Sequence, residues 1–217
     1  MHPETNEKVI AEAQEILEII RAEDYRFLAP SREDAKALMF SYTESVSLRA
    51  HMLGVEASMA AYARHFGEDE EAFRLAGLLH DFDYEKHPTT DEHPVVGCRV
   101  LAEKGYSSEV IEAILGHAVY TQVPRQSLVS RTLFAVDELT GFLSAMAYVR
   151  PGGLKGMKFK SFKKKFKTAN FAAAIHRGEV EQGAEELGVS MQEHVLFLAE
   201  ALMTAFPDFP NIPEAEG

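Results

Sequence analysis

The sequence is short of cysteine, of long apolar runs and of positive charge. Cys98 is its one cysteine, so the chain forms no internal disulfide, which is usual in a reducing compartment. No apolar run reaches the length of about 18 residues that a membrane helix needs, so we expect no membrane span. Residues 1–9 carry early acids and no apolar run, so we expect no signal peptide. These absences predict a cytoplasmic protein.

Positive charge is scarce in the chain as a whole and concentrated in one segment. The chain has 22 Lys and Arg against 34 Asp and Glu, a formal net charge of −12. Affinity for a phosphate backbone comes from excess Lys and Arg, so nucleic acid is not an expected partner. Residues 150–168 are the exception, because they hold eight of the basic residues and no acid.

What the sequence does contain is ordinary globular composition. The 217 residues are 46% hydrophobic and 26% charged, which excludes a disordered or fibrous chain. A chain of this length buries a sizeable core without disulfides or structural zinc. We predict a single domain over residues 1–217, with its core at about 45–147 and with helices of 1–44 and 154–206 packed on that core.

Apolar residues recur at helical spacing along nearly the whole chain. Capping residues and glycine or proline stops set the ends of the predicted helices, among them Ser108 as the cap of residues 109–120. The predicted helices are residues 9–20, 31–42, 45–66, 70–82, 94–104, 109–120, 128–147, 159–167, 171–187 and 191–206. The tail from residue 207 is expected to be irregular or disordered. No stretch alternates cleanly as a strand does, so the predicted fold class is all-α.

Four of these helices each carry one imidazole or carboxylate on the inward face. His51, His80, His117 and Asp137 follow apolar residues of their own helix at helical spacing. A buried imidazole or carboxylate is costly unless it is paired, hydrogen-bonded or metal-bound. A single inward histidine is more often a hydrogen-bonded core residue. Several that converge from different helices are how helical bundles build metal sites.

The order of these residues resembles the HD superfamily of metal-dependent phosphohydrolases, which is named for a His-Asp doublet. The resemblance covers roughly residues 45–142 and is carried by the Leu-Leu-His-Asp run at 78–81 and by the sequences at 47–51 and 113–117. The matching positions are His51, His80, Asp81, His93, His117 and Asp137. The whole chain also looks like a group of uncharacterised bacterial predicted hydrolases. The resemblance implies an HD-domain helical bundle, here with extra C-terminal helices.

The same resemblance implies a metal site. His51, His80, Asp81 and Asp137 match the four ligands common to the superfamily. His93 and His117 match two histidines added in binuclear members, with Asp81 as the bridging carboxylate. This ligand set suits one or two divalent ions of Mn, Fe, Co, Ni or Zn. The implied reaction is attack of metal-activated water on a small phosphorylated compound, with nucleotides among the candidates.

Four cations are candidates for binding the charges of the substrate. Asp81 and Lys86 are the predicted catalytic residues. Lys86 follows the doublet and is expected to contact a substrate phosphate. Arg49, Lys160 and Lys163 complete the predicted substrate-binding set. Each also has an interpretation without a substrate. Lys86 would be a solvated lysine, Arg49 would form a structural ion pair, and Lys160 and Lys163 would lie on the solvent-exposed face of a basic helix.

Other functions stay open. The segment after the doublet reads Phe-Asp-Tyr-Glu-Lys and no Gly-Tyr-Pro signature follows, so cyclic di-GMP hydrolysis is not supported. The same six ligands also suit a di-iron oxygenase of this fold, and a catalytically silent metal or nucleotide-binding module would keep the ligands without turnover. The substrate and the oligomeric state are not fixed by the sequence.

Overall fold

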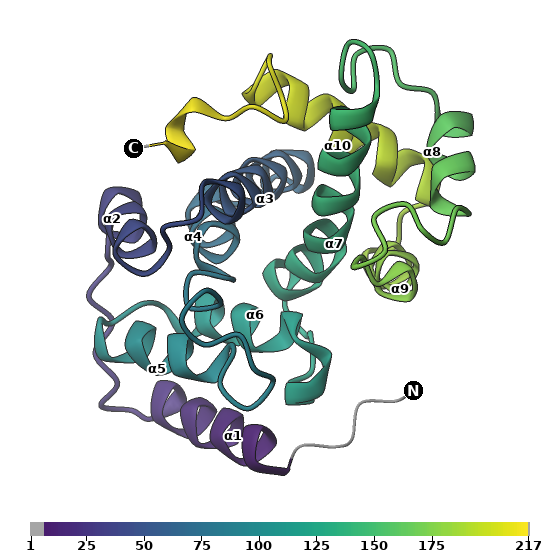
Figure 1. Ribbon diagram of the computed structural model, residues 1–217. Coiled ribbons are helices and arrows are strands. Elements are labelled where there is room, and N and C mark those ends of the chain that lie inside the picture. The colour runs from purple at the N-terminus through teal and green to yellow at the C-terminus, as the bar shows by residue number, and fades with distance from the viewer. Residues whose placement is uncertain (1–6, 217) are drawn as a thin grey trace.

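The structure is a computed structural model that describes residues 7–216. Within these residues every regular element is helical and there is no strand, which confirms the all-α fold class (Figure 1). The elements are α1 (Glu7–Arg21), α2 (Arg32–Tyr42), α3 (Val46–Phe66), α4 (Glu70–Leu79), α5 (Val95–Glu103), α6 (Ser108–His117), η1 (Val119–Thr121), α7 (Leu128–Val149), α8 (Phe159–Phe166), α9 (Arg177–Leu187), α10 (Met191–Ala205) and η2 (Pro213–Ala215). Residues 1–6 and 217 of the predicted single domain lie outside the described residues, and the division into core and appended helices stays a prediction.

Four helices, α3, α4, α6 and α7, form the centre of the bundle. α3 packs along α4, and α7 packs against α3, α6 and α9. Around them α1 lies on α5 and α6, α2 lies on α4, and α10 covers α3 and α7 (Figure 1). The centre thereby brings together four chain segments that are far apart in sequence, and each of them carries a candidate ligand.

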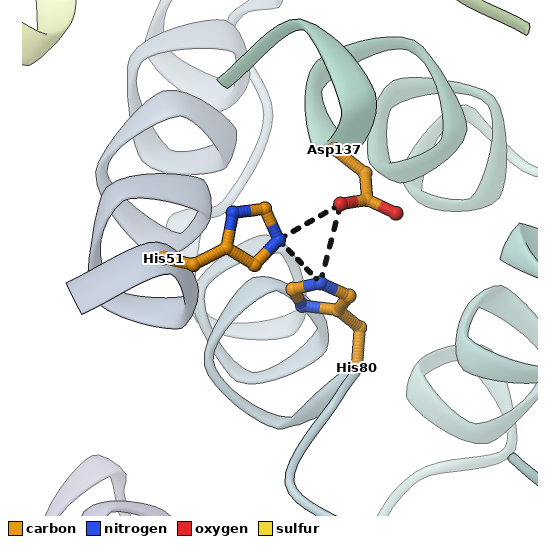
Figure 2. Close-up of side chains that lie close together, drawn as sticks. All are labelled: His51, His80 and Asp137. Carbon is orange, nitrogen blue, oxygen red and sulfur yellow. Dashed lines mark hydrogen bonds and ion pairs between the residues drawn. The ribbon is translucent and has the colours of Figure 1, made fainter. Parts of the chain in front are cut away.

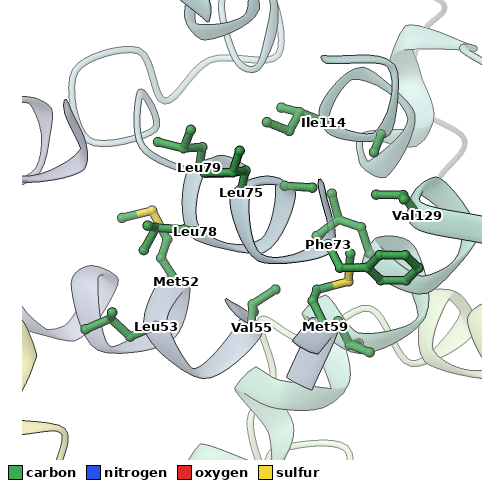
Figure 3. Close-up of a cluster of buried hydrophobic side chains, with 14 of the residues drawn as sticks. Met52, Leu53, Val55, Met59, Phe73, Leu75, Leu78, Leu79, Ile114 and Val129 are labelled. Carbon is green, nitrogen blue, oxygen red and sulfur yellow. The ribbon is translucent and has the colours of Figure 1, made fainter. Parts of the chain in front are cut away.

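The hydrophobic core lies directly beside these segments (Figure 3). Met52, Val55 and Met59 of α3 are buried, as are Leu75 and Leu78 of α4. Burial of each such side chain contributes on the order of 2 kcal/mol. Close packing of these buried side chains holds the helices that carry the polar residues in one arrangement.

A glycine sets how closely α3 and α4 approach. A Cβ atom at Gly77 would lie 2.9 Å from the backbone of Glu56, so only glycine fits at this crossing. The buried Glu56 carboxylate forms a two-pronged ion pair with Arg32 of α2 and lies 3.6 Å from Arg74 of α4. The close crossing and these pairs fix α2, α3 and α4 to one another beside the polar residues.

Two of the predicted helices have wrong boundaries. The helix predicted at 70–82 ends at Leu79, because the imidazole of His80 occupies the Gly77 carbonyl that would otherwise accept a helical N–H. The helix predicted at 109–120 begins one residue earlier, with Ser107 as its cap in place of Ser108, and ends at His117. In both cases a histidine stands at the end of a helix.

The C-terminal region also differs from the prediction. Residues 171–176 form turns, since the guanidinium group of Arg177 binds the carbonyls of Phe166, Thr168 and Phe171 and so competes with helical bonding. The tail is irregular as expected but is not disordered, because Phe209 and Ile212 are buried against the core.

The predicted absence of a membrane span needs one qualification. α7 is long and apolar enough to cross a bilayer by length and composition alone. However, 61% of that window is buried inside the bundle, which is the pattern of the central helix of a packed core. No other helix in residues 7–216 meets the same test.

Candidate metal centre

One group of converging side chains joins three helices of the bundle centre (Figure 2). His51 comes from the N-terminal part of α3, His80 from the end of α4 and Asp137 from α7. The Nε2 atom of His51 lies 3.2 Å from Nε2 of His80 and 3.0 Å from Oδ1 of Asp137. The third side, from His80 Nε2 to Asp137 Oδ1, measures 3.4 Å. We call these three residues the first trio.

A second group of the same kind lies beside it. Oδ1 of Asp81 lies 3.3 Å from Nε2 of His93 and 3.5 Å from Nε2 of His117. The two imidazole nitrogens are 3.3 Å apart. We call Asp81, His93 and His117 the second trio. The His80-Asp81 doublet therefore contributes one residue to each trio.

Asp81 faces both trios at once. While its Oδ1 atom lies in the second trio, its Oδ2 atom lies 3.5 Å from Nε2 of His80 and 4.0 Å from Nε2 of His51. The doublet sits in the turn after α4 and not inside a helix, and this turn lets neighbouring residues aim at adjoining points. The placement matches a bridging carboxylate.

Hydrogen bonds fix which nitrogen of three imidazoles faces the centre. Nδ1 of His80 bonds to the carbonyl of Gly77, and Nδ1 of His117 bonds to that of Ile114. Each acceptor stands three residues earlier in the last turn of a helix, where carbonyls lack helical partners. An Nδ1–H that donates in this way leaves Nε2 with a free lone pair. Both histidines therefore present a lone pair to the interior.

His93 is oriented by a carboxylate. Its Nδ1 atom lies 2.8 Å from Oδ1 of Asp83, and the other oxygen of Asp83 accepts the Gly97 N–H at 2.8 Å. A Cβ atom at position 97 would lie 2.7 Å from this carboxyl group, so glycine makes room for it. A carboxylate that accepts from the far nitrogen fixes the tautomer and raises the basicity of a ligand imidazole. Asp83 therefore orients His93, with Nε2 of the ring toward the second trio.

The electrostatics of the two trios depend on mutual pairing. Burial lowers the pKa of His80, but the carboxylates of Asp81 and Asp137 outweigh burial and raise it to about 9. Burial alone would raise the pKa of Asp137, whereas His80 and His51 hold it well below its usual range. The carboxylates stay ionised at neutral pH, and positive charge among the imidazoles stabilises them.

The donor atoms fit divalent metal ions. Imidazole and carboxylate ligands bind such ions at about 2.0 to 2.2 Å, which separates neighbouring ligand atoms by about 3.0 to 3.4 Å. The first trio spans 3.0 to 3.4 Å and the second 3.3 to 3.5 Å. Lone pairs that face one another at this range repel unless a proton or a metal ion lies between them. The side chains thus have the chemistry and the spacing of two ligand sets.

The two trios have a buried side and an open side. His80, His93 and His117 are buried, whereas the side chains of His51, Asp81 and Asp137 are each about one fifth exposed. The two carboxylates and His51 are therefore partly accessible to solvent.

Several residues beside the two trios were not anticipated from the sequence. The Tyr84 ring packs edge-on against His93, and the Tyr120 hydroxyl donates to the His93 carbonyl at 3.0 Å. On α7 and α9, Nδ1 of His176 lies 3.0 Å from Glu138 and 3.8 Å from Glu179. Burial and the nearby Asp137 raise the pKa of Glu138. The only sequence signal was that Glu138 follows Asp137 directly.

The four cations predicted to bind substrate have other contacts. The Arg49 guanidinium donates to the Thr43 carbonyl at 2.7 Å and lies over the Phe40 ring. The Lys86 ammonium donates to the Ser41 carbonyl at 2.9 Å. Lys160 and Lys163 are exposed on the outer helix α8. None of these contacts joins the trios, and the substrate-binding roles of all four stay predictions.

Comparison with known proteins agrees with this geometry. The HD domain family matches residues 48–141, a range that contains all six residues of the two trios. Ribonuclease Y of Oleidesulfovibrio alaskensis is 29% identical over 119 residues, which cover 54% of this chain and 21% of that protein. The chain thus spans about a fifth of the length of that relative. No solved structure matches the chain.

Residues 48–141 match the HD domain family, which is the superfamily that the sequence resemblance implied. Members of this superfamily are metal-dependent phosphohydrolases in general, and HD domains bind divalent metals. The clustered His and Asp side chains of this chain are able to hold such ions.

Proposed function

We propose that this protein is a phosphohydrolase that uses two divalent metal ions to hydrolyse a small phosphorylated compound. The carrying observation is the position of Asp81, with one carboxylate oxygen directed to each trio. In the proposal, His51, His80 and Asp137 hold one ion, His93 and His117 hold the other, and Asp81 joins them. Two metal ions held in this way would neutralise phosphoryl charge and activate water near neutral pH.

The chain's own residues provide orientation in this proposal. The carbonyls of Gly77 and Ile114 and the carboxylate of Asp83 hold three imidazoles with Nε2 toward the centre. The surrounding core keeps these groups in place, so they need no rearrangement when substrate arrives. The partial exposure of the Asp81 and Asp137 carboxylates favours a compact substrate whose phosphoryl group reaches them.

The test is a phosphoester panel with metal-loaded protein. The protein is stripped of metal, reloaded separately with Mn²⁺, Ni²⁺, Zn²⁺ or Fe²⁺, and assayed for phosphate release from phosphomonoesters, nucleotides and cyclic nucleotides. A single-stranded RNA belongs in the panel because the relative is named a ribonuclease. Turnover that requires metal and disappears in Asp81→Ala supports the proposal. Oxygen uptake with Fe²⁺ and no phosphate release would replace it with an oxygenase.

A further inference from the structure

The strongest surface feature outside the metal centre is a group of exposed lysines on and before α8. We call it the lysine surface and define it as Lys155, Lys158, Lys160, Lys163, Lys164 and Lys167. Four of these follow the spacing 160, 163, 164 and 167, which places them on one face of the helix. The intervening Phe162 is buried and packs edge-on against Phe142 of α7. α8 is therefore held rigidly, with its charged face outward.

The charge of this surface is not neutralised by the protein. None of its lysines forms an ion pair with a carboxylate among residues 7–216, although the chain carries a net charge of −12. Glu181 and Glu185 of α9 lie near Lys163 and Lys167 across a shallow hollow without pairing with them. The patch is thus a single positive region on an acidic molecule, and its own field attracts and orients a polyanion.

An exposed apolar pair precedes the lysine surface. Tyr148 is 73% exposed and Val149 is 55% exposed at the last turn of α7, directly before residues 150–158 lead into α8. Figure 1 places the end of α7, this connection and α8 at one end of the molecule, away from α1. Tyrosine and aliphatic side chains beside several lysines are the composition of surfaces that enter the headgroup region of a bilayer.

We propose that this end of the molecule docks on an anionic lipid bilayer, with the lysine surface against the headgroups and Tyr148 and Val149 inserted among them. Charge complementarity supports this occupant, because clustered lysines bind anionic headgroups additively without needing a shaped pocket. The exposed Val149 favours lipid over nucleic acid, since an aliphatic side chain gains from the headgroup region and gains nothing from a phosphate backbone. The proposal goes beyond the hydrolase function and is independent of it.

The test compares binding of the purified full chain to two kinds of vesicle by sedimentation. We expect binding to vesicles of equimolar phosphatidylcholine and phosphatidylserine, no binding to phosphatidylcholine alone, and release by high salt. The variant K160E/K164E should bind at least about 30-fold more weakly, because each lysine near the surface contributes about fivefold. Both side chains are exposed and form no hydrogen bond or ion pair with another side chain of residues 7–216, so the fold should persist, as thermal unfolding would show.

Two further variants and one competitor decide the assignment. R26E/K104E makes the same change in net charge on exposed residues of another region and should bind like the wild type. Y148S should weaken vesicle binding severalfold while its salt dependence stays unchanged. Equal loss in R26E/K104E, or no vesicle binding at all, overturns the proposal. Binding of a single-stranded RNA that K160E/K164E abolishes, without vesicle binding, overturns it in favour of nucleic acid.

Discussion

Two regions of this bundle each bury a histidine completely, and they treat it in opposite ways. His80, at the end of α4, has one nitrogen bonded to a carbonyl and the other facing two carboxylates, which raise its pKa to about 9. His194, on α10, has Nδ1 at 2.6 Å from the Tyr62 hydroxyl and Nε2 at 2.8 Å from the Ala135 carbonyl. Burial lowers the pKa of His194 to about 4.

The comparison separates a functional histidine from a structural one. Both nitrogens of His194 have partners within the protein, so the ring is neutral and complete as it stands. His80 has a nitrogen whose neighbours are a further imidazole nitrogen and two carboxylates, an arrangement that a proton or a metal ion stabilises. Burial is common to both histidines, and the potential ligand atoms around Nε2 of His80 are what distinguish the metal centre. Four predictions sharpen or break this contrast.

The largest effect is expected for Asp81→Ala. Removing the carboxylate that faces both trios should abolish metal loading and lower hydrolysis by about 1,000-fold or more, because metal stabilisation of transition-state charge is worth several kcal/mol. Metal content and phosphate release measure the two losses. Full metal content in this variant would show that the ligand assignment is wrong.

His117→Ala should have a narrower effect. His117 belongs to the second trio alone, and the first trio keeps all of its atoms, so the variant should retain about half of the wild-type metal. Elemental analysis of both proteins, prepared side by side, measures this ratio. Complete loss of metal would mean that the trios do not act as separate ligand sets.

Asp83→Asn tests the orientation of His93 without removing a ligand. An amide accepts a weaker hydrogen bond from Nδ1, so metal affinity should fall by about 10- to 100-fold while the ligand atoms remain. Competition with a chelator gives the affinity. Asp91→Asn, at an exposed carboxylate in the same connecting segment, serves as the control and should leave affinity unchanged.

His194→Gln should leave metal binding intact and affect only stability, by about 1 to 3 kcal/mol. The pH dependence is more specific. An unfolded histidine takes up its proton near pH 6.5, whereas folded His194 does so near 4. The stability that the neutral ring contributes is therefore complete above pH 6.5 and is lost as the pH falls toward 4, by about 2 to 3 kcal/mol.

Denaturant unfolding of wild type and His194→Gln at several pH values checks this difference. The wild type should lose more stability than the variant between pH 6.5 and 4. Parallel pH curves for the two proteins would contradict the structural role assigned to His194.

The sequence was sufficient to predict the helical class and the six converging residues. Periodicity places His51 and Asp137 on the inner faces of long helices, and the ordered set identified the superfamily. It did not reveal that His80 and His117 end their helices, because that depends on an imidazole taking a carbonyl of the last turn. The late start of α9 at Arg177 was also missed, since the five carbonyls bound by Arg177 come together only in three dimensions.

Other features depended on distances that no pattern encodes. Arg49 and Lys86 contact backbone carbonyls, and Glu138, His176 and Glu179 gather beside the trios. Both arrangements follow from how α2, α7 and α9 pack. Helical spacing predicts which face a residue occupies and does not predict which neighbour it meets there.

The most direct test of the central claim is the metal content of the protein, purified without chelators and without a histidine tag. Elemental analysis should find up to two transition-metal atoms per chain, one for each trio, and the element found directs the choice between phosphoester and oxygen assays. Protein that holds no metal, even after incubation with Mn²⁺, Fe²⁺, Ni²⁺ and Zn²⁺, would contradict the account, because the six side chains would then form a polar cluster without a ligand.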